Sequence, residues 1–428
     1  MARAWDPVRW RSAFFTIWTG QAFSLFGSQL VQFALVWWLT QTTGSATVLA
    51  GATLIALLPQ ILVAPLVGAF VDRRDRRWVM VLADGGIALA TLGLALLFAF
   101  GVAQVWHVYL ALLVRSTGGA FHWPAMQSST AMMVPERHLA RIGGLNQSLY
   151  GLSSIVAPPL GALLLACLPM HSILAIDVAT AVVAIVPLLG LRIPSLSLDP
   201  SAATRPSVFA DLRVGFRFVA AWRPLLVIIT AAAVINLFAN PAVSLLPVLV
   251  TRHFGGGALQ LAQLESVFGV GVVIGGVLLG VLGGFKRRMV TAMASLFLQG
   301  IGFAVVGLLP GTGLAAATVA MALIGLMNPI CNGALFAAIQ ARVPHEMQGR
   351  VLSLLASGAA AASPLGLLAA GPLADRFGVP IWYAVAGTVM VAVSLLVTAI
   401  PRVVRFETDR GPGGGAPPHA DGPPAAAA

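Results

Sequence analysis

The chain carries very little charge for its length. Charged residues make up 9% of its 428 residues and hydrophobic residues 58%, whereas soluble domains contain about 25% charged and about 45–50% apolar residues. A water-soluble fold of this size could not bury so much apolar surface. The composition therefore excludes an ordinary soluble protein and indicates an integral membrane protein.

Several signatures of chemistry are also missing. The two cysteines, Cys167 and Cys331, are interpreted as small apolar side chains and not as a disulfide or a metal cluster. The seven histidines are dispersed, and no two stand at helical ligand spacing. A Gly-x-x-x-x-Gly-Lys-Ser/Thr loop and strand-like alternation are absent as well. These absences argue against a metalloenzyme, an ATPase and an outer-membrane barrel, and they predict no cofactor and no metal site.

Long apolar runs are what the sequence does contain. Runs of about 20 apolar residues cross a bilayer as helices, because a helix satisfies its own backbone hydrogen bonds. The predicted fold class is an all-α membrane protein with twelve transmembrane helices. The first span is too long and too polar for a cleavable signal peptide. The spans are predicted at residues 12–40, 46–71, 77–101, 104–133, 138–166, 171–191, 224–252, 260–284, 287–310, 312–342, 347–375 and 380–403.

The basic residues predict which side of the membrane each loop faces. If the amino terminus is cytoplasmic, the outer loops hold only Arg252 and Arg376 of the 25 Lys and Arg residues, and Arg115 lies within a span. Cytoplasmic loops of membrane proteins carry such an excess of Lys and Arg. We therefore expect a multi-pass protein of the cell (plasma or inner) membrane with both termini in the cytoplasm. The net charge of +11 reflects this topology, and no nucleic-acid binding is predicted.

The spans fall into two groups of six separated by a polar gap. The loop after the fourth span recurs 209 positions later, where Val343, Pro344 and Arg350 repeat Val134, Pro135 and Arg141. Parallel repeats of this kind are typical of transporters. The predicted domains are a six-helix bundle at 1–191, a cytoplasmic linker with an amphipathic helix at 192–223, a second six-helix bundle at 224–403 and a disordered cytoplasmic tail at 404–428.

Polar residues gather on the first, fourth, seventh and tenth predicted helices. Helical spacing places those of each helix on one face, and polar groups face lipid only at high cost. The alternative is that these side chains merely hydrogen bond to neighbouring helices. We expect a shared substrate cavity lined by Gln21, Ser24, Ser28, Gln32, Arg115, His122, Asn236, Asn240, Asn328 and Asn332.

Few charged residues lie deep within the spans. Arg115 is about 16 Å into its span and requires water or a counter-ion there. Arg115, Asp177 and Glu265 are the candidates for coupling transport to protons, although Asp177 and Glu265 could simply be hydrated near the outer interface. Asp84, near the inner end of the third span, is expected to pair with the cytoplasmic arginines.

The loop between the second and third spans resembles the signature loop of the major facilitator superfamily. Its pattern is Gly-x-x-x-Asp-Arg followed by a basic cluster, and this chain has Asp75 where many members have glycine. The resemblance implies that the loop acts as a cytoplasmic gate. The matching residues are Gly68, Asp72, Arg73, Arg76 and Arg77.

Two further stretches carry the same resemblance. Arg115-Ser-Thr-Gly-Gly is similar to the helix-4 arginine motif of this family. Pro158, Pro159 and Gly161 resemble a degenerate form of the helix-5 motif of exporters, with Ala157 in place of the usual glycine. Prolines at these positions should kink the fifth helix. The pattern as a whole is most similar to the branch that contains macrolide-efflux and enterobactin-exporter proteins.

This resemblance implies the major facilitator fold, with two pseudo-symmetric six-helix bundles. The implied function is secondary active transport by alternating access, as proton-coupled efflux of a bulky, partly apolar small molecule such as a drug, a macrolide or a siderophore-like metabolite. The partners it implies are the substrate and the lipid bilayer, and the protein is expected to be a monomer. Uptake of a small metabolite is the alternative, and a membrane-embedded enzyme or another non-transport protein is less favoured.

Overall fold

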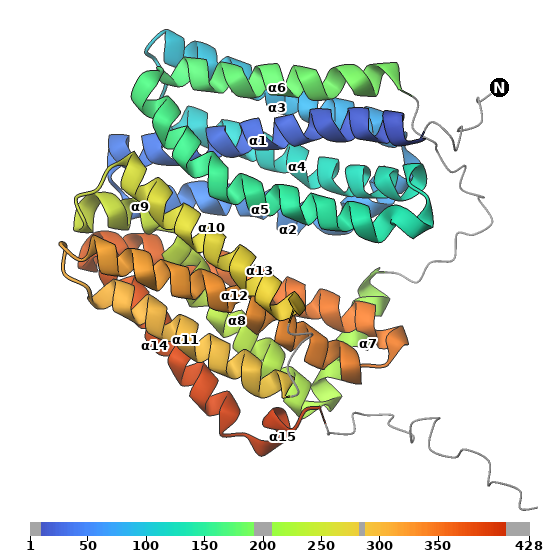
Figure 1. Ribbon diagram of the computed structural model, residues 1–428, viewed down its shortest axis with the longest axis vertical. Coiled ribbons are helices and arrows are strands. Elements are labelled where there is room, and N and C mark those ends of the chain that lie inside the picture. The colour runs from blue at the N-terminus through green and yellow to red at the C-terminus, as the bar shows by residue number, and fades with distance from the viewer. Residues whose placement is uncertain (1–9, 192–207, 282–286, 408–428) are drawn as a thin grey trace, which may run out of the picture.

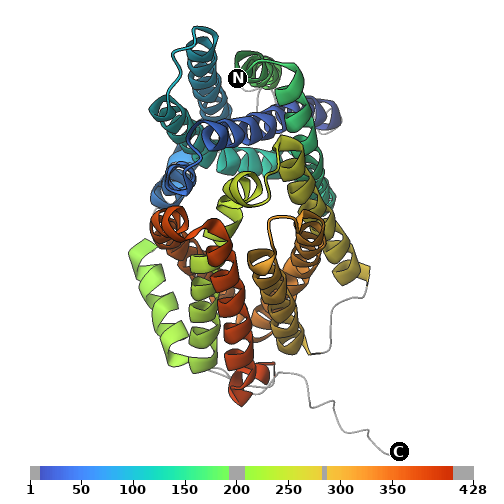
Figure 2. The same cartoon turned by 90° about the vertical axis from the view of Figure 1, so that its left-hand side faces the viewer.

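The computed structural model describes residues 10–191, 208–281 and 287–407, and these residues form helices and short connections (Figure 1). Two groups of helices stack against each other in both ribbon views (Figures 1 and 2). The predicted disordered tail and the first half of the predicted linker lie largely outside the described residues.

The amino-terminal half consists of six long helices. Ser45 caps the second of them, because its side chain accepts a hydrogen bond from the backbone N–H of Val48. The helices are α1 (Trp10–Thr43), α2 (Ala46–Arg73), α3 (Arg76–Ala99), α4 (Val105–Met133), α5 (Glu136–Cys167) and α6 (Met170–Gly190).

The remaining helices begin with α7, a helix of 14 residues in the segment that was predicted to link the halves. Six long helices follow it, with short elements between and after them. They are α7 (Val208–Ala221), α8 (Arg223–Ser244), α9 (Leu246–Val248), a π-helical turn η2 (Leu249–His253), α10 (Ala258–Val281), α11 (Arg288–Leu308), α12 (Leu314–Arg342), α13 (His345–Phe377), α14 (Val379–Thr398) and α15 (Pro401–Val404).

The seventh predicted span, 224–252, is not one helix. Helix α8 ends at Ser244, and α9 and η2 follow it. Pro241 and Pro247 flank this break, and proline lacks the N–H that an uninterrupted helix requires. Hydropathy alone could not detect the break, since the residues on both sides of it are apolar.

In the described part of the chain, eleven helices are long and apolar enough to cross a membrane. The remaining long helix is α4, whose 29 residues extend roughly 43 Å. Arg115 and His122 lower its hydropathy, but α4 packs against α2 and α3 inside the bundle. Arg115 and His122 therefore face the interior of the bundle. The fold has twelve long helices in two sets of six, as predicted.

The apolar core differs between the halves. In the amino-terminal half one buried apolar cluster includes Phe14 and Met80, and a separate one includes Leu35 and Leu112. The buried apolar residues of the carboxy-terminal half form a single cluster, which also includes Phe33, Leu49 and Ala162 of the first half. The two clusters of the first half are separated along the helices by a layer of polar and charged side chains.

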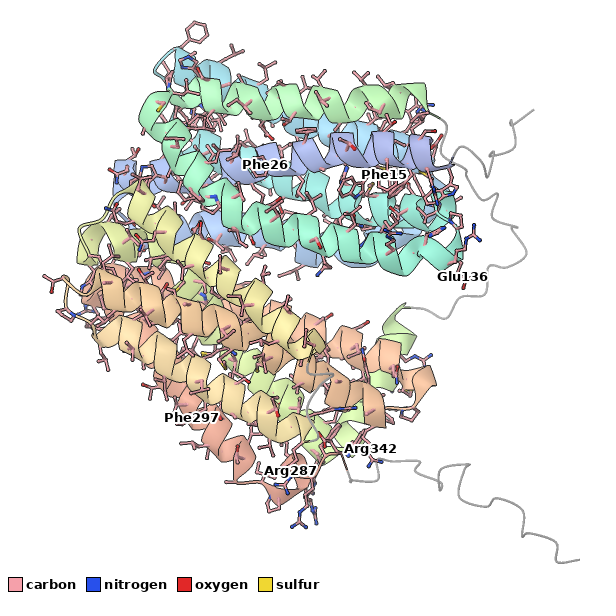
Figure 3. The ribbon with its side chains drawn as sticks, in the orientation of Figure 1. Phe15, Phe26, Glu136, Arg287, Phe297 and Arg342 are labelled. Atoms are coloured by element: carbon pink, nitrogen blue, oxygen red, sulfur yellow. The ribbon has the colours of Figure 1, made fainter. Side chains whose placement is uncertain are left out.

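The halves contact each other mainly through α2 with α13 and α5 with α10. Ser266 Oγ of α10 donates to the carbonyl of Ile155 in α5 at 2.8 Å. The halves meet at the end of the molecule that holds α9 and draw apart toward the opposite end (Figure 1). Figure 3 shows Glu136, Arg287 and Arg342, which come from three segments predicted to face the cytoplasm, at that opposite end.

Candidate functional site

Polar side chains of the amino-terminal half line one cavity of about 460 Å³. All six helices of that half contribute to its wall. A larger groove of about 880 Å³ lies on the face formed by α2, α3 and α4, and its mainly apolar lining suits a surface that lipid covers. The predicted residues that line the polar cavity are Gln21, Ser24, Ser28, Gln32, Arg115, His122 and Asp177.

Arg115 and Asp177 form a buried ion pair beside this cavity. Nη1 of Arg115 contacts Oδ2 of Asp177 and donates to Thr91 Oγ1 at 2.7 Å. Ser28 Oγ donates to the other carboxylate oxygen of Asp177 at 3.0 Å. The two charged side chains are 10% and 2% exposed. Each charge thus has an opposite charge and a hydroxyl as partners, which is what a charge held away from water requires.

The close approach of α1 to α6 makes this pair possible. A Cβ atom at Gly27 would overlap Thr180 Oγ1, and one at Gly20 would lie 3.0 Å from the carbonyl oxygen of Val183. Glycines seven residues apart lie on one helix face. This glycine face lets α6 bring Asp177 to Ser28 and Arg115.

Asp84 forms a second polar cluster in the same cavity. Gln21 Nε2 donates to Asp84 Oδ2 at 3.0 Å, and His122 Nε2 lies 3.4 Å from Oδ1. The expectation that Asp84 pairs with the cytoplasmic arginines was wrong. Asp84 lies eight residues, about 12 Å, along α3 from Arg76, and its side chain points inward, where it is 5% exposed.

A second cavity of about 340 Å³ lies between the halves. Its wall combines residues of α1, α2 and α5 with residues of α8 to α12 and of α14, and it contains the predicted residue Glu265. Gln29, Gln32 and Thr53 line both this cavity and the polar one. The two cavities are therefore neighbours that share part of one wall.

The asparagines of the other half do not line either cavity among the described residues. Asn236 and Asn332 donate to backbone carbonyls one turn earlier in their own helices. Asn240 donates to Asn236 and to Ser363 Oγ. For these residues and Asn328 a place in the substrate cavity stays a prediction.

The predicted gate loop is described only in part. Gly68, Asp72 and Arg73 belong to the last turns of α2, where the structure describes their backbone alone. Asp75 caps α3 by accepting from the backbone N–H of Arg77 at 3.0 Å. The guanidinium of Arg77 donates to the carbonyl of Leu189 at the end of α6, and Arg76 donates to Met132 Sδ at the end of α4. The two arginines thus hold together the ends of three helices.

Helix α5 continues through the predicted kink at Pro158 and Pro159. Gly161 faces Phe33 of α1, and a Cβ atom at this glycine would lie 2.8 Å from Phe33 Cδ1. Glycine at this position therefore lets α5 approach Phe33.

The sequence prediction missed a contact at the end where the halves meet. The carboxylate of Asp375, near the end of α13, accepts from Ser45 Oγ at 2.7 Å and from the backbone N–H groups of Ala46 and Thr47 at 2.8 and 2.9 Å. Arg252 Nη1 lies 3.5 Å from Asp375 Oδ1. A carboxylate at a helix amino terminus is stabilised by the free N–H groups and the helix dipole.

A signal for this contact was present in the sequence. Gly371, Asp375 and Arg376 have the spacing of Gly68, Asp72 and Arg73 in the signature loop. A Cβ atom at Gly371 would lie 2.8 Å from Thr47 Cα. The glycine thus allows the close crossing, and the aspartate one turn later caps the opposing helix.

Comparison with known proteins gives the family. The family model described as Major Facilitator Superfamily matches residues 17–367. The chain belongs to the Major Facilitator Superfamily. It is a transporter of small molecules in a membrane and not an enzyme, as the sequence predicted.

Relatives within the superfamily cover nearly the whole chain. Macrolide efflux protein A of Streptococcus pyogenes is 34% identical over 398 residues, which are 93% of this chain and 98% of that protein. Multidrug efflux pump Tap of Mycobacterium tuberculosis (strain CDC 1551 / Oshkosh) is 29% identical over 383 residues, 86% of this chain and 88% of that one.

Solved structures support the fold. A bacterial homologue of the human lysosomal transporter Spinster superposes with a TM-score of 0.67 at 15% identity, covering 94% of this chain and 98% of that one. A transporter of the POT family gives 0.69 at 11% identity, with 90% and 96% covered. At these identities the similarity establishes the major facilitator fold and nothing finer.

Proposed function

We propose that this transporter exports a bulky, partly apolar small molecule, such as a drug, a macrolide or a siderophore-like metabolite, and that protons drive the export. The observation that carries the direction is the 34% identity to macrolide efflux protein A over 93% of the chain. A second relative, Tap, is a multidrug efflux pump by name, and efflux is transport out of the cell.

The cavities are consistent with such a substrate. The polar cavity offers amides, hydroxyls and charged groups, while the neighbouring cavity has a mainly apolar wall. Volumes of about 460 and 340 Å³ lie in the range of small-molecule sites. A substrate with a polar end and an apolar body would occupy both.

The coupling candidates remain Arg115, Asp177 and Glu265. Protonation of Asp177 would remove the charge that Arg115 faces, and the guanidinium would then need another partner. A substrate or a rearranged helix can provide one. This exchange of partners is a physical link between proton uptake and a change in the cavity.

Alternating access requires that each end of the molecule opens in turn. In the proposed cycle, Asp375 on the amino terminus of α2 keeps one end closed, and the loop of Asp72, Arg73 and Arg77 closes the other. We assign the end with Glu136, Arg287 and Arg342 to the cytoplasm because basic residues favour that side. Both termini then lie in the cytoplasm of a cell-membrane protein that works as a monomer.

Accumulation of a radiolabelled macrolide tests this function. A bacterial strain without its own drug pumps should accumulate several-fold less macrolide when it expresses the chain, and a protonophore should abolish the difference. The double variant Arg115→Gln/Asp177→Asn, which leaves no unpaired buried charge, serves as the inactive control when it is expressed to the same level. Greater accumulation in cells with the intact chain would contradict export and support the alternative, uptake.

A further inference from the structure

A carboxylate stands in an aromatic cavity between the halves. The cavity of about 340 Å³ contains Glu265 of α10, and its aromatic lining residues are Phe33, Phe268, Phe303 and Tyr383. The rings of Phe303 and Tyr383 stack at a centroid distance of 5.7 Å. Phe33 belongs to the amino-terminal half and the other residues to the second half, so the site spans both.

Two polar groups of this cavity, the Glu265 carboxylate and the Tyr383 hydroxyl, have no protein partner among the described residues. Among the described residues, no hydrogen bond or ion pair involves the Glu265 carboxylate, and the buried Tyr383 hydroxyl has no partner either. Tyr383 is 0% exposed and lines the same cavity as Glu265. The charged groups of the neighbouring cavity differ, since Asp177 has Arg115 and Asp84 has Gln21 and His122.

An unpaired carboxylate in an apolar cavity is costly unless a proton or a cation neutralises it. Aromatic faces also attract cations through their quadrupoles, and they contact apolar groups equally well. A carboxylate, a phenol hydroxyl and several aromatic rings thus suit a lipophilic cation better than a neutral or an anionic molecule.

We infer that Glu265 and the aromatic residues around it bind the positively charged amine of an amphipathic substrate. This inference rests on the proposed function and names the chemical class of its substrate. The remainder of the substrate extends into the polar cavity, past Gln29, Gln32 and Thr53, which line both cavities. Since α5, α8, α10 and α14 all contribute to the wall, a bound cation contacts both halves of the transporter.

Binding of radiolabelled tetraphenylphosphonium to the purified full-length protein tests this inference. This probe is lipophilic and permanently cationic, so its own charge does not vary with pH. Glu265→Gln should weaken binding by about tenfold or more, because a charge-assisted contact is lost. Triphenylphosphine oxide, a neutral molecule of similar shape, should compete poorly.

Two matched variants separate charge from folding. Glu265→Asp keeps the carboxylate and should bind the cation more tightly than Glu265→Gln does. Glu136→Gln removes an exposed carboxylate far from the cavity and should bind like the unchanged protein. Thermal unfolding of each variant in detergent verifies that it is folded.

The inference is overturned if the unchanged protein does not bind the cation, if Glu265→Gln binds it equally well, or if Glu265→Asp loses as much affinity as Glu265→Gln. Binding to the purified protein does not depend on transport. Failure of the proposed export, seen as unchanged macrolide accumulation in cells, is therefore distinguishable from failure of the cation site.

Discussion

At the residue scale, the interior charges fall into two classes. In the amino-terminal half, Asp177 is ion paired with Arg115, and Asp84 accepts from Gln21 beside His122. In the cavity between the halves, Glu265 has no such partner among the described residues. Buried ion pairs contribute little net stability compared with apolar residues, but the loss of one partner is costly. The paired charges therefore suit a role in coupling, whereas Glu265, also a coupling candidate, is in addition free to bind a ligand.

Removal of one member of the Arg115–Asp177 pair should destabilise the protein strongly. Arg115→Gln leaves an unpaired buried carboxylate, and the free energy of unfolding should fall by roughly 3 kcal/mol. The double variant Arg115→Gln/Asp177→Asn contains no unpaired charge and should recover most of that loss. Thermal unfolding in detergent measures both effects.

Arg213→Gln is the matched control for charge removal, because Arg213 is exposed on α7. It should unfold at the same temperature as the unchanged protein. Transport distinguishes coupling from stability, since the double variant should be stable and yet inactive. A double variant that transports normally with an unchanged pH profile would exclude a coupling role for this pair.

The sequence identified these charged residues but not all of their partners. Depth along a helix follows from counting residues, so the need of Arg115 for a counter-ion was predictable. The pairing of Asp84 was not, because the rotation of α3 about its axis depends on how it packs with α1, α4 and α6. Tyr383 was missed for a similar reason, since a tyrosine in an apolar span gives no polar pattern.

At the element scale, glycines set how closely α10 and α12 approach. A Cβ atom at Gly325 of α12 would overlap the carbonyl oxygen of Phe268, and one at Gly271 of α10 would lie 2.6 Å from that of Ala322. These contacts involve backbone atoms, which cannot rotate away. Small residues at helix crossings allow such close packing in membranes.

Gly325→Ala should therefore push α10 and α12 apart and lower the free energy of unfolding by about 1–3 kcal/mol, as overpacking does. Gly276→Ala in α10 is the control, because a Cβ atom there meets nothing within 4 Å. It should be neutral or slightly stabilising, since alanine favours helices over glycine. Thermal unfolding compares the two variants, and equal stability would contradict the close crossing.

The contact of Asp375 with the start of α2 should control access from the end where the halves meet. Asp375→Ala removes a capping interaction of about 1 kcal/mol, so the open state should become roughly fivefold more populated. Labelling of Thr53→Cys with a membrane-impermeant thiol reagent measures this access. The background requires Cys167→Ser and Cys331→Ala, because both native cysteines are free.

Arg376→Ala tests the specificity of that effect, because Arg376 is the exposed neighbour of Asp375. Its labelling rate should match that of the parent. If Asp375→Ala also labels at the parental rate, the contact does not hold this end closed.

Helix positions were largely predictable from the sequence, since apolar length and charge placement define them. The break after Ser244 was not, because both sides of it are apolar. Asp375 could have been singled out from its spacing to Gly371, which repeats that of Asp72 to Gly68. The repeat alone, however, does not reveal that the aspartate contacts α2.

At the scale of the whole molecule, two helical bundles meet at one end and draw apart toward the other (Figure 1). The described contacts between them involve α2 with α13 and α5 with α10. Helices α2 and α10 are each the second long helix of their half, and α5 and α13 are each the fifth, so the two contacts are equivalent in the two repeats. A rocking motion of the halves can therefore break contacts at one end of the molecule while it forms equivalent contacts at the other. The repeat in the sequence predicted the two bundles, but which end is closed depends on tertiary contacts that no local pattern encodes.

Export driven by protons is tested most directly in proteoliposomes loaded with a radiolabelled macrolide. The orientation of the protein in the liposome membrane is determined from the protease protection of the loop after α6. A pH gradient, acidic on the side corresponding to the cell exterior, should move the macrolide toward that side. The movement should stop when a protonophore collapses the gradient, and the Arg115→Gln/Asp177→Asn protein should show none. Movement at the same rate without the gradient, or movement of the macrolide in the same direction as the protons, would contradict proton-driven export.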